Sequence, residues 1–530
     1  MPTLKWIGKD KVINYHNEVP FRSLNERREY SVNGNETENL LIKGDNLEAL
    51  KALLPYYYNR IKAIYIDPPY NTGNENWTYN DNVNSPEIRK WLGKVVGGEA
   101  EDLTRHDKWL CMMYPRLKLL RELLSEDGVF FVSIDDNEVH NLRMLMDEVF
   151  QPNNFIANLI WRKKKVRGRG AKLILPQTEY VYIYAKNISS LDVFSEPLTS
   201  EMLNEYNFED EKSIYKLIPL AKSGTSQSPR PNLVYDITAP DGTKIPCPTH
   251  QWRWSRETLK REIEGDNVVF KKSNGKWKVF SKQRLYDEEG NQREKTPISY
   301  YDRYTTTDGT TTIKEIFGKV VFDFPKPYQM IRDFIVWTTS KEDIILDSFA
   351  GTGPTAHAVL ALNKEDGGNR KFILVECEDS IAKDITAERL KRVIQGYSYE
   401  KSSGQEIKVE RLGGGFKFLE LGNPLFDKHK QIIGQPSYED LAGYIYFTET
   451  HSTIDWGKAS RGDWYVGENG GVNYFIIYGG KNELGEEFLQ IAKCYQGKKV
   501  VYADAVMIDD DELERFDIIF KQIPYEIKTF

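Results

Sequence analysis

Cysteine is scarce in this chain of 530 residues, which contains only four. They lie far apart, at Cys111, Cys247, Cys377 and Cys494, and no two of them form a C-x-x-C pair. This spacing argues against a disulfide framework and against a structural zinc site. The seven histidines show no metal-ligand spacing either. The sequence therefore predicts no metal site.

Long hydrophobic runs are also missing. No stretch approaches the roughly 18 consecutive apolar residues that read as a membrane-spanning helix. The first residues, MPTLKWIGKDKV, lack the apolar core of a secretory signal. We therefore expect a soluble, cytoplasmic protein without membrane association. The P-loop pattern G-x-x-x-x-G-K-[ST] is absent as well, so ATP-driven work would need a separate subunit.

An overall excess of positive charge is missing too, because the formal net charge is -7. Nucleic-acid binding would therefore require a local basic surface. The stretch WRKKKVRGRGAK supplies such a surface, and its flanks, NFIANLIW and TEYVYIYAKN, alternate like the two strands of a β-hairpin. The predicted DNA-binding residues of this loop are Arg162, Lys163, Lys164, Lys165, Arg167 and Arg169. A plain solvated loop would have the same composition.

A second basic cluster, HQWRWSRETLKRE, mixes aromatic rings with positive charge. Trp252, Arg253 and Trp254 combine ring faces for base stacking with a guanidinium for phosphate contacts. We predict that these three residues contact DNA, although a tryptophan is more often a core residue than a ligand.

Strands and helices alternate along much of the chain, which predicts an α/β fold with a mostly parallel sheet. The rhythm breaks between residues 188 and 316, which are polar and rich in turns, as an inserted domain would be. It returns in DIILDSFAGTGPTAHAVLAL and KFILVECE, and beyond residue 400 the pattern becomes β-rich and mixed. The predicted organisation is therefore four segments, at 1–187, 188–316, 317–400 and 401–530.

One glycine loop follows an apolar strand, in DSFAGTGPTA. Asp347 ends that strand, and Gly351 and Gly353 allow a tight turn and a close approach to a ligand before a helix begins. Glu376 ends the next strand, where a carboxylate can accept both hydroxyls of a ribose. Because the glycine pattern also passes as a dinucleotide fingerprint, the loop alone leaves NAD and other adenosine cofactors open.

The stretch YIDPPYNTG is an unusual strand ending. The exocyclic amine of adenine is a poor nucleophile because its lone pair is delocalised into the ring. A site that accepts hydrogen bonds from both N–H groups turns that lone pair toward an electrophile. Asp67 offers a carboxylate and Pro68 a carbonyl, which the Pro68–Pro69 pair holds rigidly. Tyr70 offers a face for a flipped-out base.

The tetrapeptide at 67–70 together with the loop at 347–355 resembles the DNA amino-methyltransferases that use S-adenosyl-L-methionine. The catalytic motif precedes the cofactor loop, as in the β-class. The segments LLIKGDNLEALKALL, FPKPYQMI and DDELERFDIIFKQIPYEIK are similar to modification subunits of type III restriction systems. The resemblance implies a Rossmann-like methyltransferase fold: a mostly parallel seven-stranded sheet with a β-hairpin, an inserted target recognition domain and a C-terminal region.

The resemblance also assigns residues. The catalytic set is Asp67, Pro68, Pro69 and Tyr70. The set for the cofactor S-adenosyl-L-methionine is Asp45, Asn46, Lys326, Pro327, Asp347, Phe349, Ala350, Gly351, Gly353, Thr355 and Glu376. Aspartate at the head of the tetrapeptide favours adenine N6 over cytosine N4 as the target.

The function that the resemblance implies is methyl transfer to N6 of a flipped-out adenine in double-stranded DNA. It also implies a homodimer and a possible partner, a restriction subunit with helicase and nuclease activity. The alternatives are a cytosine-N4 methyltransferase, an RNA amino-methyltransferase, a non-catalytic DNA-binding module and an NAD-dependent oxidoreductase. An oxidoreductase would have no use for Asp67 to Tyr70.

Overall fold

The computed structural model describes residues 3–72, 93, 104–165, 173–222, 230–247, 251–401, 403–427, 429 and 431–528. The chain divides into two compact units. The first unit comprises Met1–Val193 and Ile298–Phe530, and the second comprises Phe194–Pro297. Each unit has its own hydrophobic core, so the two are described separately.

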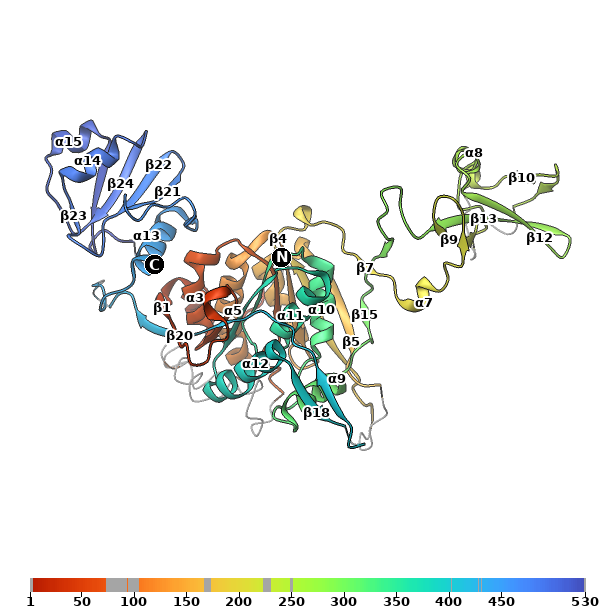
Figure 1. Cartoon of the computed structure of the whole chain (residues 1–530), viewed down its shortest axis with the longest axis horizontal. Coiled ribbons are helices and arrows are strands. Elements are labelled where there is room, and N and C mark those ends of the chain that lie inside the picture. The colour runs from red at the N-terminus through yellow and green to blue at the C-terminus, as the bar shows by residue number, and fades with distance from the viewer. Residues whose placement is uncertain are drawn as a thin grey trace. The chain divides into compact units, whose positions relative to one another are not determined.

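A ten-stranded sheet organises the first unit (Figure 1). Its order is β1-β20-β2-β17-β16-β3-β4-β6-β5-β15. The seven central strands are those that the sequence predicts: β2 (Leu40–Lys43), β17 (Lys371–Glu376), β16 (Ile344–Asp347), β3 (Ile61–Ile66), β4 (Leu124–Ile134), β6 (Thr178–Ala185) and β5 (Phe155–Arg162). The sequence did not predict the three edge strands β1 (Arg22–Glu26), β20 (Lys417–Pro424) and β15 (Tyr300–Tyr301).

Most of this sheet is parallel. From β20 through β4 each strand is parallel to the next, whereas β1 is antiparallel to β20, and β6 is antiparallel to both β4 and β5. This confirms the predicted mostly parallel sheet with a β-hairpin. Since the carboxyl ends of parallel strands lie at one edge, the loops after β2, β17, β16 and β3 meet there.

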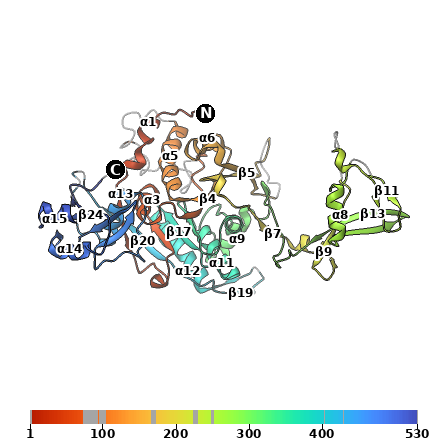
Figure 2. The ribbon, with the colours of Figure 1, turned by 90° about the horizontal axis from the view of Figure 1, so that it is seen from above.

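Helices cover both faces of the sheet (Figure 2). One layer contains α1 (Lys9–Val12), α3 (Asn46–Tyr57), α5 (Arg105–Leu123) and α6 (Val139–Phe150). The other contains α9 (Thr306–Phe317), α10 (Tyr328–Thr338), α11 (Pro354–Asp366) and α12 (Glu388–Gln395). Short α2 (Tyr15–Glu18) packs against α5.

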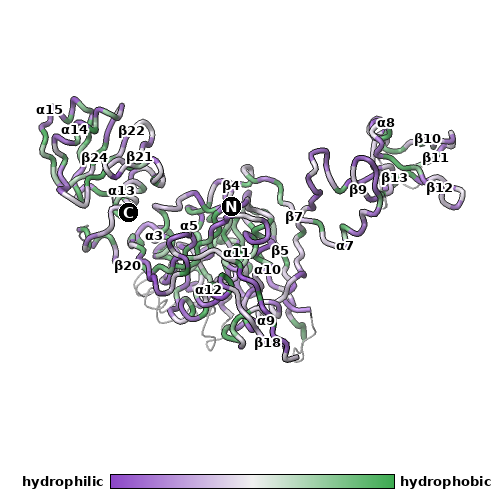
Figure 3. The backbone as a smooth tube through the Cα atoms, in the orientation of Figure 1, coloured by the Kyte–Doolittle hydropathy of each residue, from purple (hydrophilic) through white to green (hydrophobic). Residues whose placement is uncertain are grey.

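Strand β3 shows why this sheet is packed against helices on both faces. Ile64 and Ile66 belong to the core formed with α3, α5 and α6, whereas the Tyr65 ring lies 6.2 Å from the Phe334 ring of α10. A strand buried on both faces is expected to be continuously apolar, as this one is from Ala63 to Ile66. Figure 3 shows green, hydrophobic stretches concentrated in the middle of the first unit, where the strands of this sheet lie.

Helix α5 ends earlier than the sequence suggests. The helical pattern extends to Gly128, but β4 already begins at Leu124, which pairs with Ile61 of β3. The last residues of the helical apolar pattern therefore belong to β4, because they pair with β3. At the other end, Thr104 and Asp107 form a capping box that fixes the first turn.

The chain after residue 396 first forms a hairpin, β18 (Tyr397–Glu400) with β19 (Glu406–Val409), and then enters the main sheet as β20. Helix α13 (Tyr438–Thr450) follows and packs against α3. A smaller sheet has the order β21-β22-β24-β26. The remaining elements are β21 (Tyr465–Asn469), β22 (Val472–Ile476), β23 (Glu483–Leu484), α14 (Glu486–Ala492), β24 (Lys498–Ala503), β25 (Ala505–Val506), α15 (Asp510–Arg515) and β26 (Ile518–Gln522).

The second unit is built around an antiparallel sheet, β12-β13-β9-β8. Its elements are β7 (Glu196–Pro197), α7 (Ser200–Leu203), β8 (Phe208–Glu209), β9 (Ile214–Pro219), β10 (Ile237–Thr238), β11 (Lys244–Ile245), α8 (Arg256–Glu264), β12 (Val268–Ser273), β13 (Lys276–Arg284) and β14 (Glu294–Lys295). The unit is narrower than the predicted 188–316, because β15 pairs with β5 and α9 packs against α12 of the first unit.

Within the described residues, no helix is long and apolar enough to cross a membrane. Among the same described residues, no group of three or more His, Cys, Asp or Glu side chains could hold a metal ion.

Candidate active site

The sheet brings the two sequence motifs together. Strands β3 and β16 are parallel neighbours, with Ile64 paired to Leu346. Asp67 follows β3 directly and Asp347 is the last residue of β16. The tetrapeptide at 67–70 and the glycine loop at 348–353 therefore leave the same edge of the sheet side by side, where ligands bind in open α/β sheets.

The carboxylate of Asp67 is held by a lysine from a distant part of the chain. Lys326 Nζ lies 2.8 Å from Asp67 Oδ1 and 2.9 Å from Oδ2. The Tyr70 hydroxyl lies 2.9 Å from the same Oδ1. The Asp67 side chain remains 19% exposed and that of Lys326 only 8%, so the pair is nearly enclosed.

Glu179, near the start of β6, is a second carboxylate beside this pair. Its Oε2 lies 3.7 Å from Lys326 Nζ and 3.1 Å from the Tyr70 hydroxyl. Its Oε1 accepts a hydrogen bond of 2.8 Å from Lys163 Nζ. Two carboxylates and two ammonium groups thus form one nearly buried network that is neutral overall.

Burial and charge act against each other in this network. Burial raises the pKa of Asp67, and Glu179 adds to that effect, while Lys326 and Tyr70 oppose it. Burial would also raise the pKa of Glu179, but the charges of Lys326 and Lys163 outweigh burial and lower it. The pKa of Lys326 is raised because its two carboxylates outweigh burial.

Lys326 lies between aromatic rings. Its Nζ is 4.8 Å from the centroid of the Tyr70 ring and 5.6 Å from that of Trp161, which is cation–π range. Gly309 of α9 makes room for the segment that carries it, since a Cβ there would lie 2.0 Å from the Pro325 carbonyl oxygen. Only glycine allows this approach.

Helix α5 supports the tetrapeptide from behind. The indole nitrogen of Trp109, which is fully buried, donates a 2.7 Å hydrogen bond to the Pro69 carbonyl. Asn71 has a left-handed φ of 57° and donates to Glu138 and to the Arg105 carbonyl. These contacts fix the chain on both sides of Tyr70.

The glycine loop is organised by two acids. Asp347 accepts hydrogen bonds from the Thr355 hydroxyl at 2.5 Å and the Phe349 amide at 3.1 Å. Glu376 accepts from the Gly351 amide at 2.9 Å. Burial raises the pKa of Asp347 to about 7. Gly353 has a φ of 74°, and a Cβ there would meet the Thr386 methyl group at 3.0 Å, so this turn also requires glycine.

Asp45 and Asn46 begin α3 beside this loop. Asp45 caps the helix by accepting from the Leu47 and Glu48 amides. Asn46 donates to the Ser348 carbonyl at 2.9 Å. The buried Arg116 of α5 binds both residues through Asp45 Oδ2 and Asn46 Oδ1. Strands β2 and β16 thus present their loops as one connected surface.

These residues fit an adenosine-type cofactor by their chemistry. Carboxylate oxygens at Glu376 and Asp45 can accept from hydroxyl or amine groups, and the two left-handed glycines let backbone approach a ligand. The described structure places the predicted residues Asp45, Asn46, Asp347, Phe349, Ala350, Gly351, Gly353, Thr355 and Glu376 around one loop. Lys326 instead turns its side chain to Asp67, while Pro327 is the N-cap residue just before α10.

The predicted DNA-binding residues differ in availability. Lys164 and Lys165 are exposed beside β5, and Arg162 is half-buried, whereas Lys163 points to Glu179. Arg167 and Arg169 lie outside the described residues.

The prediction that Trp252 contacts DNA needs correction. Its ring is 2% exposed in the core of the second unit, and its Nε1 donates to the Tyr235 carbonyl at 2.7 Å. Arg253 is exposed, and Trp254 lines a cleft of about 1170 Å³ together with Lys282, Arg284 and Arg293. The alternation of aromatic and charged residues in the sequence does not indicate which tryptophan is buried.

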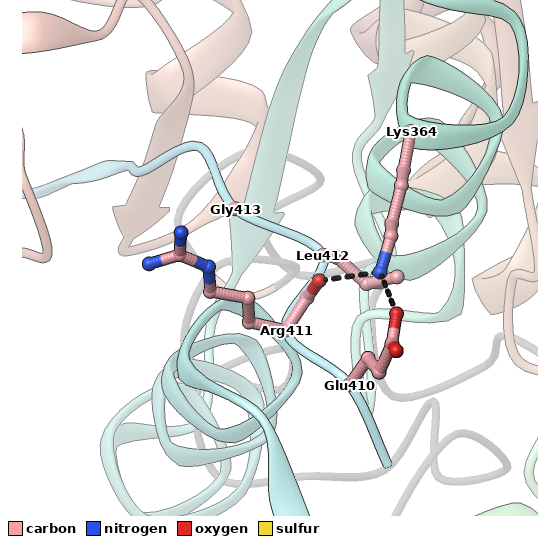
Figure 4. Close-up of a pocket in the computed structure, with 5 residues that line it drawn as sticks. All are labelled: Lys364, Glu410, Arg411, Leu412 and Gly413. Atoms are coloured by element: carbon pink, nitrogen blue, oxygen red, sulfur yellow. Dashed lines mark hydrogen bonds and ion pairs between the residues drawn. The ribbon is translucent and has the colours of Figure 1, made fainter.

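A shallower pocket of about 450 Å³ lies at the end of α11 (Figure 4). Lys364 reaches across it and donates to the Glu410 carboxylate at 3.1 Å and the Arg411 carbonyl at 2.8 Å. None of its lining residues belongs to the two predicted motifs.

Several residues of the site were missed by reading the sequence. They are Glu179, Trp161, Trp109, Arg116 and, as a partner of Glu179, Lys163. The signal that was available is the acid in TEYVYIYAKN, a charged residue inside an otherwise apolar strand.

Comparison with known proteins gives consistent relatives. A profile of the N6/N4 methylase family, described as DNA methylase, matches residues 61–388. The EcoPI Mod subunit of Escherichia phage P1, from a type III restriction-modification enzyme, is 35% identical over 456 residues, covering 78% of this chain and 68% of the relative. The StyLTI Mod subunit of Salmonella typhimurium LT2, also type III, is 33% identical over 436 residues, covering 79% and 62%.

The type II methyltransferase M.KpnI of Klebsiella pneumoniae is 30% identical over 437 residues, covering 74% of this chain and 99% of the relative. The chain thus spans about two thirds of the length of the two type III Mod subunits. The matched segment contains the tetrapeptide, the glycine loop and the Lys326 network, and it confirms the resemblance drawn from the two motifs. The chain therefore belongs to the N6/N4 DNA methylase family.

Proposed function

We propose that the protein is a site-specific DNA methyltransferase that acts on N6 of adenine with S-adenosyl-L-methionine as methyl donor. The observation that carries this proposal is the position of Asp67 and Pro68 at the end of β3, beside the glycine loop of β16. Together these two loops offer a place for an amine next to a place for an adenosine cofactor.

Asp67 and Pro68 act on the amine of the target base. The Asp67 carboxylate accepts one N–H and the rigid Pro68 carbonyl accepts the other, so the nitrogen lone pair turns out of conjugation. When bound, S-adenosyl-L-methionine supplies a sulfonium methyl group for this lone pair. The methylated nitrogen releases one proton, and Asp67, whose pKa burial raises, is the nearest base to take it.

The remaining site residues position the two ligands. Glu376 and Asp45 accept from the hydroxyl and amine groups of the cofactor, and Phe349 packs beside it. Tyr70 stacks on the adenine after it leaves the duplex, a step that costs a few kcal/mol. Rate enhancement then comes from proximity and preorganised acceptors.

The substrate in this proposal is duplex DNA. Arg162, Lys164 and Lys165 lie at the end of the β5–β6 hairpin and supply phosphate contacts. The second unit, with Arg253 and Trp254, serves as the target recognition domain. A homodimer and a separate restriction subunit are proposed as partners, because two relatives are Mod subunits of type III restriction-modification enzymes.

Single-molecule sequencing of DNA from cells that express the protein tests this proposal. We expect N6-methyladenine in one sequence context with the wild type and none with Asp67→Ala at equal protein level. Modification that persists in the Asp67→Ala cells, or no modification in either, would refute it.

Cytosine N4 is the second candidate target, because the matching family includes both N6 and N4 methylases. Mass spectrometry of the digested DNA separates the two nucleosides. We expect N6-methyldeoxyadenosine, and N4-methyldeoxycytidine in its place would move the assignment to cytosine.

A further inference from the structure

Lys326 occupies both features that the target adenine needs. Its ammonium contacts both oxygens of Asp67 and lies over the ring of Tyr70. We propose that Lys326 is a positioning residue that holds the place of the target amine and moves to Glu179 when the adenine enters. This inference rests on the proposed function, since it specifies how the same site receives its base.

The target amine and Lys326 compete for the Asp67 carboxylate. An N–H group of the incoming amine needs an Asp67 oxygen as acceptor, and Lys326 Nζ lies 2.8 and 2.9 Å from the two oxygens. An ammonium and an amine are both nitrogen donors of similar size. Because Oδ1 already accepts from both Lys326 and Tyr70, the incoming amine competes with the lysine for this carboxylate.

The target base and Lys326 also need the same space over the Tyr70 ring. Lys326 Nζ is 4.8 Å from the Tyr70 centroid. A base stacked on this face of the ring would take the volume that the ammonium fills, since offset-stacked rings have centroids about 4.5–7 Å apart. Binding of the adenine would thus displace Lys326 from the Asp67 carboxylate and from the Tyr70 ring at the same time.

A second carboxylate, Glu179, is already in place to receive the lysine. Glu179 Oε2 lies 3.7 Å from Lys326 Nζ, so a shift of about 1 Å brings the pair to hydrogen-bond distance. The Glu179 side chain is 10% exposed. A nearly buried ammonium without a carboxylate is costly, so the second acid lets lysine leave Asp67 and stay paired.

Tyr70 couples the two carboxylates. Its hydroxyl lies 2.9 Å from Asp67 Oδ1 and 3.1 Å from Glu179 Oε2, and its single proton can be donated to only one of them at a time. As Lys326 moves to Glu179, the Tyr70 proton is free to serve Asp67. The hydroxyl thus compensates Asp67 for part of the contact that the lysine gives up.

Lys326 also governs the ionisation of Asp67. The titratable groups that face this carboxylate or act on it electrostatically are Lys326, Glu179, Tyr70, Tyr65 and Asp347. Lys326 is the cation among them, while burial and the acids raise the Asp67 pKa. Removing the ammonium should therefore raise the pKa of Asp67 further and favour its protonated form, which accepts without a full charge.

Two substitutions at Lys326 separate charge from mobility. In Lys326→Met, we expect the pH profile of methyl transfer to move to higher pH, because the cation that favours the ionised form of Asp67 is gone. In Lys326→Arg, the cation is kept, so the pH profile should match the wild type. Its KM for DNA should rise instead, because a bidentate guanidinium leaves a carboxylate less readily.

Glu179→Gln tests the receiving position. We expect kcat/KM for DNA to fall about tenfold or more, with unchanged S-adenosyl-L-methionine affinity by calorimetry. When Glu179→Gln is added to Lys326→Met, kcat/KM for DNA should fall by less than about a further twofold, because the effects of coupled residues are non-additive. Duplex affinity measured by anisotropy with S-adenosylhomocysteine present should fall in Glu179→Gln alone, a readout independent of turnover.

Lys364→Met is the matched control, because Lys364 pairs with Glu410 away from the site, and it should keep the wild-type rate and pH profile. Thermal melting of each variant checks that it is folded. A Lys326→Met enzyme with the wild-type pH profile, or additive effects of Lys326 and Glu179, would overturn the inference while the wild type still transfers methyl groups. A wild type that transfers none at any pH would overturn the proposed function and this inference with it.

Discussion

Two aspartates end neighbouring strands of one sheet, yet they have different surroundings. Asp347 is 1% exposed and accepts from the Thr355 hydroxyl and the Phe349 amide. Asp67 is 19% exposed at its side chain and lies against the Lys326 ammonium. The comparison teaches that position at the edge of the sheet does not assign a role. A sealed carboxylate that accepts from donors of its own loop shapes that loop, and an accessible one beside a lysine is available for chemistry.

The largest expected effect separates the two aspartates by function. Asp67→Ala should lower methyl transfer by about 100-fold or more, since it removes an acceptor aimed at the reacting group. Its affinity for S-adenosyl-L-methionine should change by less than about twofold, because independent sites do not couple. Asp347→Ala should lose cofactor affinity because Thr355 and Phe349 lose their acceptor. A tritiated-methyl assay and calorimetry on both proteins measure this difference.

A protein in which both substitutions weaken cofactor binding equally would break the comparison. Melting temperatures of the two variants serve as the control for folding.

The second expected effect is a pH dependence that belongs to Asp347. Its pKa is raised from 3.8 to about 7 by burial, so its stabilising contribution is complete below about pH 4 and is lost as pH rises to about 7. The shift corresponds to about 4 kcal/mol at most, at 1.36 kcal/mol per pKa unit. Asp347→Asn stays neutral and should not show this loss.

Thermal midpoints of the wild type and Asp347→Asn, measured from pH 4 to pH 8, check this prediction. The difference between the two proteins should grow in favour of Asp347→Asn as pH rises. A constant difference across the range would mean that Asp347 ionises without cost.

Sequence reading could predict what is contiguous in the chain. Asp67 to Tyr70 and Asp347 to Thr355 each lie within one loop, so residue type and order were enough. Lys326 meets Asp67 across 259 positions, and Glu179 meets Tyr70 across 109 positions. Only the sheet brings such residues together, which is why the sequence assigned Lys326 to the cofactor side and passed over Glu179.

The same reasoning applies to the fold. The seven central strands have strong apolar patterns and were predicted. Strand β20, by contrast, pairs with β2 although the two are far apart in the sequence. Trp252 was misassigned because its burial depends on neighbours such as Tyr235 and Leu259. A local mixture of rings and charges does not reveal those neighbours.

The third prediction concerns Gly309, which makes room for the segment that carries Lys326, the partner of Asp67. Gly309→Ala places a Cβ 2.0 Å from the Pro325 carbonyl oxygen, so the segment that carries Lys326 must move. We expect a destabilisation of about 1–3 kcal/mol and a loss of methyl transfer. Gly462→Ala is the control, because a Cβ there meets nothing within 4 Å. Equal behaviour of the two variants in melting and activity assays would show that the approach to Pro325 is unimportant.

The fourth prediction concerns the loop behind Asp67. Trp109→Phe removes the donor to the Pro69 carbonyl, and an unsatisfied buried acceptor costs about 1–3 kcal/mol. We expect kcat to fall with little change in cofactor affinity, because the glycine loop is untouched. Steady-state kinetics measure the split, and a loss confined to cofactor affinity would contradict this role of Trp109.

The smallest effect is expected at the hairpin. Replacing the exposed Lys164 and Lys165 by Gln should weaken DNA binding and reduce the slope of log K against log salt by about 2. Lys163→Gln should leave this slope unchanged, since Lys163 pairs with Glu179. Anisotropy titrations at several salt concentrations make the comparison, and a reduced slope in Lys163→Gln would assign that lysine to the DNA surface.

The most direct test of the account is a structure of the protein with S-adenosylhomocysteine and a duplex that contains its methylated sequence. We predict that the adenine N6 lies within hydrogen-bond distance of the Asp67 carboxylate and the Pro68 carbonyl, with the Lys326 ammonium on Glu179. A base bound elsewhere, with Lys326 still on both oxygens of Asp67, would contradict it.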